Sequence, residues 1–134
     1  MSKNNRNTSE NDNKNTREVI FHPENAVPRE FKAAPERQRD VFAVSLTMMG
    51  KGMEPTCAVS PLASLGHGVY ELKINGRPAW RCIYTTEVAG KIVVLHVTEK
   101  TTNGSDRQIA NVVEERLKTL REKLKQARKQ QSKM

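Results

Sequence analysis

Aromatic residues and cysteines are scarce in this chain of 134 residues. Aromatic side chains make up 4% of the sequence, and the two cysteines are Cys57 and Cys82. Neither cysteine belongs to a C-x-x-C pair or has the spacing of a zinc site. We therefore expect a small, mostly aliphatic core with two free thiols in a reducing compartment, and not a disulfide-stabilised scaffold.

Long hydrophobic runs are also absent. The N-terminus has no apolar signal segment, and no stretch approaches the length of a membrane span. No group of His, Cys, Asp and Glu has ligand spacing, so we expect no metal and no other cofactor. These absences together predict a cytoplasmic protein.

Positive charge is in excess. Lys and Arg number 23 against 15 Asp and Glu, which gives a formal net charge of +8 and a pI near 9.8. A balance of this size points to a polyanionic partner, with nucleic acid first and an anionic membrane surface second. Charge that serves only solubility is the alternative.

Residues 69–100 organise the chain, because their pattern is typical of three consecutive antiparallel strands. Alternating apolar side chains predict Val69–Ile74 and Ala79–Thr86 as a hairpin. The third strand, Lys91–Thr98, is apolar on both faces, which is typical of a central strand. Gly90 is expected to take the positive φ of the turn that leads into it.

The alternation also predicts a register for the hairpin. A three-residue loop at 75–77 pairs Leu72 with Trp80 on an apolar face, whereas a two-residue Asn-Gly turn mixes the two faces. Burial therefore favours the three-residue loop, which sets Glu71 opposite Arg81. The polar face of the hairpin then carries one carboxylate and two cations: Glu71, Lys73 and Arg81.

Two helices marked by proline precede the hairpin. Pro28 suits the first position of a helix that runs to Ala34. Pro35 starts a second helix that ends near Met49. Their apolar residues predict a helix pair that covers the apolar face of the sheet. A short strand, Glu18–His22, must join the same sheet because it is too short to be stable alone.

The remaining segments lack strand patterns. Residues 1–17 form a polar tail that we predict to be disordered, and residues 53–68 are predicted as a loop. After the sheet, Ser105–Gln108 matches a capping box, and apolar residues then recur at helical spacing as far as Leu124. Residues 125–134 are a basic extension of this helix.

The predicted fold class is therefore α+β. A small, antiparallel-rich sheet, made of the first strand and the three-stranded meander, is packed by the N-terminal helix pair and by one long C-terminal helix. Along the chain we expect a disordered tail at 1–17, a folded domain at 18–124 and a basic helical extension at 125–134.

Three motifs, in this order, resemble one protein family. Leu65–Lys73 resembles the L-G-x-G-L-Y-E-L-R lead-in of phage-derived, HigB-like proteins of the RelE/ParE toxin superfamily. Ala79–Tyr84 is similar to the x-x-R-x-x-Y strand of that family, and residues 92–101 are similar to its I-V-L-L-H…K-K-T ending. The resemblance covers residues 18–124 and is specific over 65–101.

This resemblance implies the toxin of a bacterial or phage toxin–antitoxin pair, acting as an mRNA endoribonuclease, usually at the ribosome. In such enzymes a 2′-hydroxyl attacks the adjacent phosphate, and basic side chains stabilise the charge that develops. The implied partners are mRNA, the ribosome and a cognate antitoxin. The candidate catalytic residues are Arg81, Lys73, Lys100 and Glu71.

The chain departs from the better-known relatives at two points. Glu71 falls where they tend to carry a basic residue. No Tyr follows Tyr84, although those relatives use a Tyr or a basic residue near the C-terminus, and Arg107 is the closest substitute. The candidate RNA-binding residues are Arg77, Arg107, His67, Lys123, Lys125 and Arg128. A solvated, basic helix end is the alternative for the last three.

The chemistry of RNA cleavage fits the four catalytic candidates. The reaction needs a base for the 2′-proton, an acid for the leaving 5′-oxygen and cations for the phosphate. Arg81 suits the phosphate because a guanidinium binds two oxygens, while Lys73 and Lys100 can share the charge and Glu71 can act as base. We predict that Arg81→Ala abolishes cleavage and leaves the fold intact. A Glu71–Arg81 surface pair worth under about 1 kcal/mol is the structural alternative.

Other sites and functions stay open at this point. A two-histidine site would require His67 and His96 to converge, but a histidine in an apolar strand is more commonly part of the core. A non-catalytic nucleic-acid- or protein-binding module, or a gyrase-directed toxin of the ParE type, is the competing function. An enzyme needs Lys73, Arg81 and Lys100 around a concave site, whereas a binding module needs only diffuse positive charge along the C-terminal helix.

Overall fold

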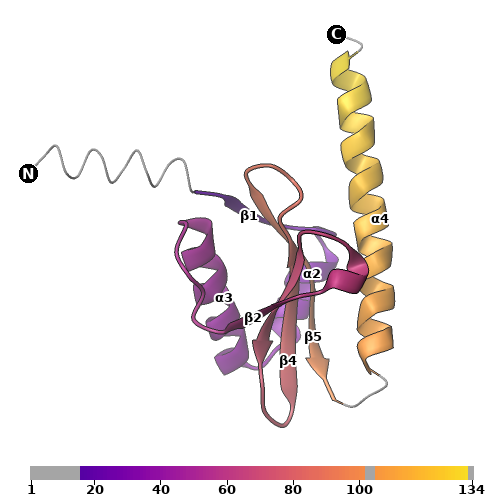
Figure 1. Ribbon diagram of the computed structural model, residues 1–134. Helices are drawn as coiled ribbons and strands as arrows, with labels where there is room; N and C mark the ends of the chain where they lie inside the picture. The colour runs from indigo at the N-terminus through magenta and orange to yellow at the C-terminus, as the bar shows by residue number, and fades with distance from the viewer. Residues whose placement is uncertain (1–15, 102–104, 133–134) are drawn as a thin grey trace, which may run out of the picture.

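The computed structural model describes residues 16–101 and 105–132. Its elements follow the chain as β1 (Glu18–Phe21), α2 (Ala26–Ala33), α3 (Glu36–Gly50), β2 (Ala58–Pro61), η1 (Ala63–Leu65), β3 (Val69–Ile74), β4 (Ala79–Thr85), β5 (Lys91–Lys100) and α4 (Ser105–Ser132). This arrangement confirms the predicted α+β class (Figure 1). The part of the predicted disordered tail at 1–15 lies outside the described residues. Arg17 donates its backbone N–H to the carbonyl of Gly50 at 2.7 Å, which ties the start of β1 to the end of α3.

The five strands form one sheet in the order β1-β5-β4-β3-β2. The predicted meander β3-β4-β5 is antiparallel, and β1 joins it parallel to β5, which is therefore central as predicted. Gly90 has a φ of 74° in the turn before β5, as expected. The prediction of a loop at 53–68 was wrong for Ala58–Pro61, because β2 pairs with β3 there. β2 is a short edge strand that ends at Pro61, so it lacks the strong alternation of a buried strand.

The predicted register of the β3–β4 hairpin was also wrong. Leu72 faces Cys82, and Trp80 faces Ile74, so the loop has four residues, 75–78. Lys73, and not Glu71, is directly opposite Arg81. The two registers differ by two residues, and a shift of two leaves every side chain on its predicted face. Alternation therefore predicts the faces of a hairpin but cannot choose between registers that differ by two.

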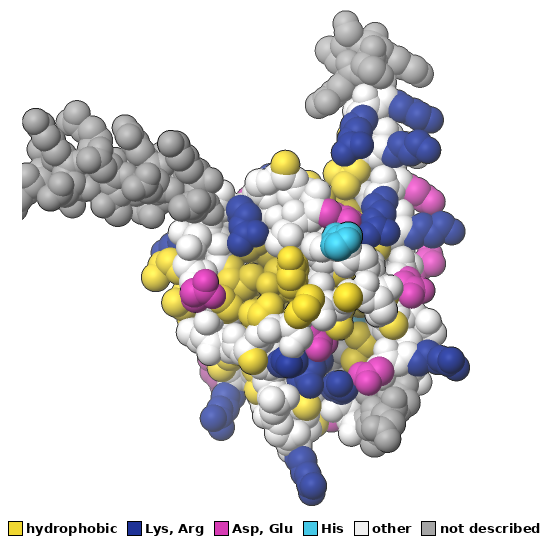
Figure 2. All heavy atoms as spheres, in the orientation of Figure 1, with side chains coloured by type: hydrophobic (Ala, Val, Ile, Leu, Met, Phe, Trp, Pro, Cys, Tyr) yellow, Lys and Arg dark blue, Asp and Glu magenta, His cyan; other side chains and the backbone are white. Residues whose placement is uncertain are grey.

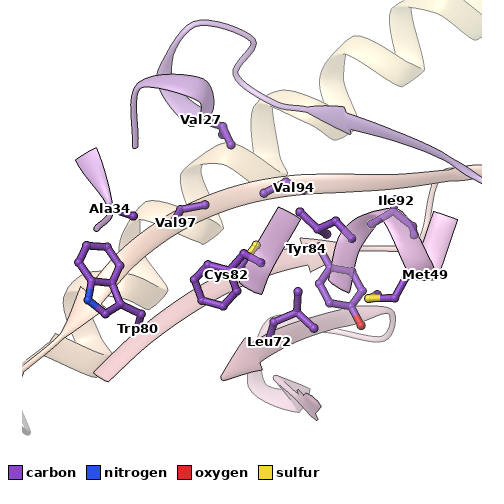
Figure 3. Close-up of a cluster of buried hydrophobic side chains, with 12 residues drawn as sticks. Val27, Ala34, Met49, Leu72, Trp80, Cys82, Tyr84, Ile92, Val94 and Val97 are labelled. Carbon is purple, nitrogen blue, oxygen red and sulfur yellow. The ribbon is translucent and has the colours of Figure 1, made fainter. Parts of the chain in front are cut away.

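The helix pair α2 and α3 covers one face of the sheet, as predicted. Figure 3 shows side chains of β3, β4 and β5 directed toward side chains of these helices. This cluster consists of Val27, Ala34, Phe42, Leu46, Met49, Leu72, Trp80, Cys82, Tyr84, Ile92, Val94 and Val97. Helix α2 begins at Ala26, two residues before the predicted start at Pro28. Pro28 still lies in the first turn, where the N–H that a proline lacks would have no partner within the helix. Helix α3 matches its predicted bounds within one residue.

Helix α4 covers most of the opposite face. Its apolar stripe packs on side chains of β3, β4 and β5, and this second cluster consists of Val69, Ile83, Val93, Leu95, Ile109, Val113, Leu117 and Leu120. Leu62 and Leu65 at η1 pack against the same cluster. Figure 1 shows α4 lying along the sheet and then running past its upper end. The predicted basic extension is helical as far as Ser132. The side chain of Ser105, on which the predicted capping box depends, lies outside the described residues.

Candidate functional site

A small pocket lies beside the first turns of α4, on the α4 face of the sheet. Its volume is about 300 Å³. Its lining residues are Leu62, Ser64, Leu65, Glu71, Lys100, Asp106, Ile109 and Ala110. Two of the four predicted catalytic residues, Glu71 and Lys100, therefore line one concave surface. We call this surface the Glu71–Lys100 pocket.

Arg81 lies behind Glu71 and is almost fully buried, with 6% of its surface exposed. Its Nη1 donates to the carbonyl of Trp80 at 3.0 Å and to that of Ile74 at 3.4 Å, and its Nη2 donates to Oδ1 of Asn75 at 3.4 Å. Its Nε is 3.8 Å from Oε2 of Glu71 and has no hydrogen-bond partner among the described residues. The guanidinium thus holds the start of the β3–β4 loop and presents one buried N–H toward Glu71.

Lys73 shares the α4 face with Arg81 and is directly opposite it across the β3–β4 pair. Like charges in that relation repel each other. Glu71, two residues before Lys73 on the same face of β3, supplies the negative charge that offsets this repulsion. The predicted catalytic residues of β3 and β4 therefore form one charged group, although Lys73 is not among the residues that line the pocket.

Lys100 ends β5 and pairs with α4. Its Nζ is 3.0 Å from Oδ1 of Asp106, whose side chain is 67% exposed. Asp106 lies in the first turn of α4, where a carboxylate interacts favourably with the helix dipole. Asp106 was not among the predicted site residues. Its place directly after the predicted N-cap was the signal that could have found it.

The predicted RNA-binding residues are spread over several elements. Arg77 lies in the β3–β4 loop, in a second pocket of about 300 Å³ that also contains Arg37. Arg107 is exposed in the first turn of α4, and His67 is exposed before β3. Lys123, Lys125 and Arg128 are exposed on the distal part of α4. At 1.5 Å per residue, Arg107 and Arg128 are about 30 Å apart along the helix axis.

A second charged cluster joins α2, β5 and α4 away from the pocket. Oε1 of Glu30 is 3.0 Å from Nδ1 of His96 and accepts the N–H of Val97 at 3.0 Å, and Oε2 is 2.8 Å from Nη2 of Arg116. Burial acts to raise the pKa of Glu30, but these hydrogen bonds outweigh it and lower the pKa from 4.5 to about 2. His96 is therefore held by structural contacts, and no sequence pattern had indicated Glu30 or Arg116.

Both tyrosines of the chain lie on the helix-pair face and not at the pocket. Tyr70 and Tyr84 are directly opposite each other on β3 and β4, with ring centroids 5.6 Å apart. Burial raises the pKa of Tyr84 to about 12, so its phenol stays protonated at neutral pH. Any acid or base at the Glu71–Lys100 pocket must therefore come from other side chains.

The sequence also led to expectations about disulfides, metal sites and membrane spans. Cys57 and Cys82 are free thiols, as predicted, and burial raises the pKa of Cys82. Among the residues that the structure describes, no three His, Cys, Asp or Glu side chains lie close enough together to hold a metal ion. None of the helices, within the described ranges, is long and apolar enough to cross a membrane.

Comparison with known proteins gives one family. Residues 29–130 match the model of a family described as "Phage derived protein Gp49-like (DUF891)", and this match covers more than half of the chain. No curated protein and no solved structure matches the chain.

Proposed function

The chain belongs to the Gp49-like family of phage-derived proteins, which is part of the RelE/HigB-like toxin group, and we propose that it is a toxin that cleaves RNA. The proposal places it in a toxin–antitoxin pair, with mRNA at the ribosome as its substrate and an antitoxin as its protein partner. Such a toxin acts in the cytoplasm. Two departures from the better-known relatives, Glu71 and the missing C-terminal Tyr, require this chain to use its own set of groups.

One observation carries the proposal: Glu71 and Lys100 line the same pocket. A carboxylate and an ammonium group facing one concave surface supply a base and an acid for phosphodiester cleavage. The pocket is at the lower end of the size range of ligand sites, which suits one phosphate and its ribose. The buried Nε of Arg81 adds a charged donor directly behind the carboxylate.

In the proposed mechanism, a carboxylate oxygen of Glu71 takes the proton of the 2′-hydroxyl. The 2′-oxygen then forms a bond to phosphorus while the bond from phosphorus to the 5′-oxygen breaks, and Nζ of Lys100 donates a proton to that leaving oxygen. Lys73 and Arg81 lie beside Glu71 outside the pocket lining, and their positive charges favour a negative charge that develops on a phosphate in the pocket. The mechanism requires no metal ion. The products are a 2′,3′-cyclic phosphate and a free 5′-hydroxyl.

The burial of Arg81 gives this residue a second role. Its bonds to Trp80, Ile74 and Asn75 hold the β3–β4 loop, so its substitution affects the loop as well as the charge near Glu71. The prediction that Arg81→Ala abolishes cleavage and leaves the fold intact therefore needs an unfolding measurement beside the activity measurement. Lys100→Ala is the cleaner test, because Lys100 contacts an exposed carboxylate at the end of a strand.

The end groups of cut RNA test the proposed chemistry. RNA is isolated from a bacterial host in which the chain is induced, and the fragment ends are determined at each new cut. Attack by a 2′-hydroxyl predicts cyclic phosphates upstream and 5′-hydroxyls downstream of the cut, and both are lost with Lys100→Ala. Fragments that begin with a 5′-phosphate would contradict the mechanism.

A second function is supported by the distribution of positive charge. The distal part of α4 carries Lys123, Lys125 and Arg128, which lie far from the Glu71–Lys100 pocket, and Arg81 is buried. Such dispersed positive charge is enough for a module that binds its target without cleaving it. This alternative includes a gyrase-directed toxin of the ParE type. It predicts growth arrest with no new RNA ends, and unchanged arrest in the Lys100→Ala variant.

A further inference from the structure

A pocket beside the β3–β4 loop gathers positive charge without a carboxylate. Its volume is about 300 Å³, and its polar side chains come from Arg37 and Gln38 in the first turn of α3 and from Asn75 and Arg77 in the loop. None of the described residues that line it is Asp or Glu. Two exposed arginines that are far apart in the sequence therefore face one concave surface. We call it the Arg37–Arg77 pocket.

The two guanidinium groups of this pocket are not neutralised by the chain itself. Within residues 16–101 and 105–132, neither Arg37 nor Arg77 has an ion pair or a side-chain hydrogen bond. The basic pocket on the distal part of α4 differs, because Arg121 there donates two hydrogen bonds to Glu87. Like charges that line one pocket repel each other, and an anion bound between them would replace this repulsion with charge-assisted hydrogen bonds.

Buried Arg81 prepares a further donor at the edge of the pocket. Its Nη2 donates to Oδ1 of Asn75 at 3.4 Å. Because the amide oxygen is engaged in this bond, Nδ2 of Asn75 is left as the group that can donate to a ligand. The first turn of α3 adds the positive end of a helix dipole. The pocket thus presents two guanidinium groups and one oriented amide to an anion.

The donors and their surroundings favour a phosphate of a polyanion. A guanidinium group binds two phosphate oxygens at once and keeps its charge at any physiological pH. The volume lies at the lower end of the range for ligand sites, which suits one phosphate and its sugar. Figure 2 shows further Lys and Arg side chains over the lower end of the molecule, where Figure 1 places the β3–β4 loop. Neighbouring phosphates of the same strand would meet this positive surface.

We propose that the Arg37–Arg77 pocket binds a phosphate group of the RNA backbone. This inference rests on the proposed function for the RNA and adds a second point of contact outside the Glu71–Lys100 pocket. Arg81 connects the two pockets, because its Nη2 contacts Asn75 and its Nε is 3.8 Å from Oε2 of Glu71. The Arg37–Arg77 pocket holds and positions the strand, and no bond breaks there.

An RNA that cannot be cleaved provides the test. The probe is a single-stranded RNA with a 2′-O-methyl group on every ribose, and its binding to the full chain is followed by fluorescence anisotropy at several salt concentrations. Arg37→Gln and Arg77→Gln change the pocket. The matched control is Arg39→Gln, on the same helix but outside the lining. Each substitution lowers the net charge by the same amount, so a difference between them reports position.

We expect Arg37→Gln and Arg77→Gln each to weaken binding at least about tenfold, and Arg39→Gln to weaken it less than about threefold. Loss of the phosphate contact should also reduce the slope of log K against log salt by about 0.7. Because both arginines hold one phosphate, the double variant should lose less than the product of the two single losses. Equal weakening by all three single variants would mean that net charge alone attracts RNA, which overturns the proposal.

Two further arms identify the source of the anion. Poly-glutamate binding that Arg37→Gln weakens as much as RNA binding would assign the pocket to an acidic protein and overturn the proposal. Release of the RNA by millimolar inorganic phosphate at constant ionic strength would assign it to free phosphate, with the same consequence. Since the probe lacks a 2′-hydroxyl, failure of the cleavage proposal would leave all of these outcomes unchanged.

Discussion

The two faces of the sheet differ in the side chains that they carry. The face under α2 and α3 carries a continuous set of apolar side chains. The face under α4 has an apolar centre but also carries Glu71, Lys73 and Arg81. The helix-pair face borders a pocket of about 690 Å³ at the end of α3, whose lining includes Arg17, Glu54 and Tyr84. The α4 face has a pocket of about 300 Å³ near the start of α4 and a groove of about 450 Å³ between β1 and the distal half of α4.

The largest expected effect lies on the helix-pair face. Phe42 is fully buried, so Phe42→Ala leaves a cavity and should lower the free energy of unfolding by about 3–5 kcal/mol. Val44 on the same helix is 50% exposed, and Val44→Ala should cost less than about 0.5 kcal/mol. Urea unfolding followed by circular dichroism measures both. Similar losses for the two variants would mean that α3 does not bury the predicted face.

The next largest effect is expected on RNA cleavage, from a substitution on the α4 face. Lys100→Ala removes the proposed acid, and we expect RNA cleavage to fall about 100-fold or more. Its free energy of unfolding should change by less than about 1 kcal/mol, because its ion pair is with an exposed carboxylate. Cleavage is measured on RNA from induced cells and stability on the purified chain. If Lys100→Ala lost both RNA cleavage and folding, the loss of cleavage could not be assigned to Lys100. That result would also contradict the expectation that Lys100 contributes little to the stability of the fold.

Glu30 connects the two faces, since it joins α2 to β5 and α4. Glu30→Gln leaves Arg116 without its anion, and we expect a loss of about 1–3 kcal/mol in the free energy of unfolding at pH 7. The folded pKa of about 2 lies below the ordinary value of 4.5. The contribution of Glu30 is therefore complete above pH 4.5 and is lost as the pH falls toward 2.

Unfolding of the wild type and of Glu30→Gln at several pH values measures this effect. The difference between the two proteins should shrink as the pH falls through this window. A difference that stayed constant from pH 7 to pH 2 would show that the charge of Glu30 makes no contribution.

The smallest effect is expected at the margin of the pocket. Asp106→Asn removes the partner of Lys100, but the Asp106 side chain is 67% exposed, so the free energy of unfolding should fall by less than about 1 kcal/mol. The remaining difference from the wild type should vanish in 1 M salt, where exposed charges are screened. A larger, salt-independent loss would mean that the pair anchors α4 to the sheet.

The sequence predicted which residues face each side of the sheet, because alternation and helical spacing depend directly on burial. It did not predict the register of the hairpin, since Leu72 opposite Cys82 and Leu72 opposite Trp80 place the same residues on the same faces. Strand β2 escaped prediction because an exposed edge of four residues carries little pattern. Long-range contacts such as Glu30 with Arg116 leave no local signal.

The candidate site was predicted through a resemblance and only partly through chemistry. Glu71 and Lys100 were named as site residues, and they line one pocket. The burial of Arg81 was not foreseen, because a polar residue in an alternating strand is expected to face solvent. Its buried guanidinium donates to the carbonyls of Ile74 and Trp80, at the strand ends beside the loop, and to the side chain of Asn75 in the loop. The alternation could not predict these contacts.

The most direct test of the account is the induction of three proteins in a bacterial host, with mapping of new RNA 5′ ends. The proteins are the wild type, Lys100→Ala, and Lys32→Ala, which removes an exposed lysine from α2 on the other face. We expect new ends inside messages for the wild type and Lys32→Ala, and their loss in Lys100→Ala. New ends that persist in Lys100→Ala would contradict the assignment of the Glu71–Lys100 pocket as the site of cleavage.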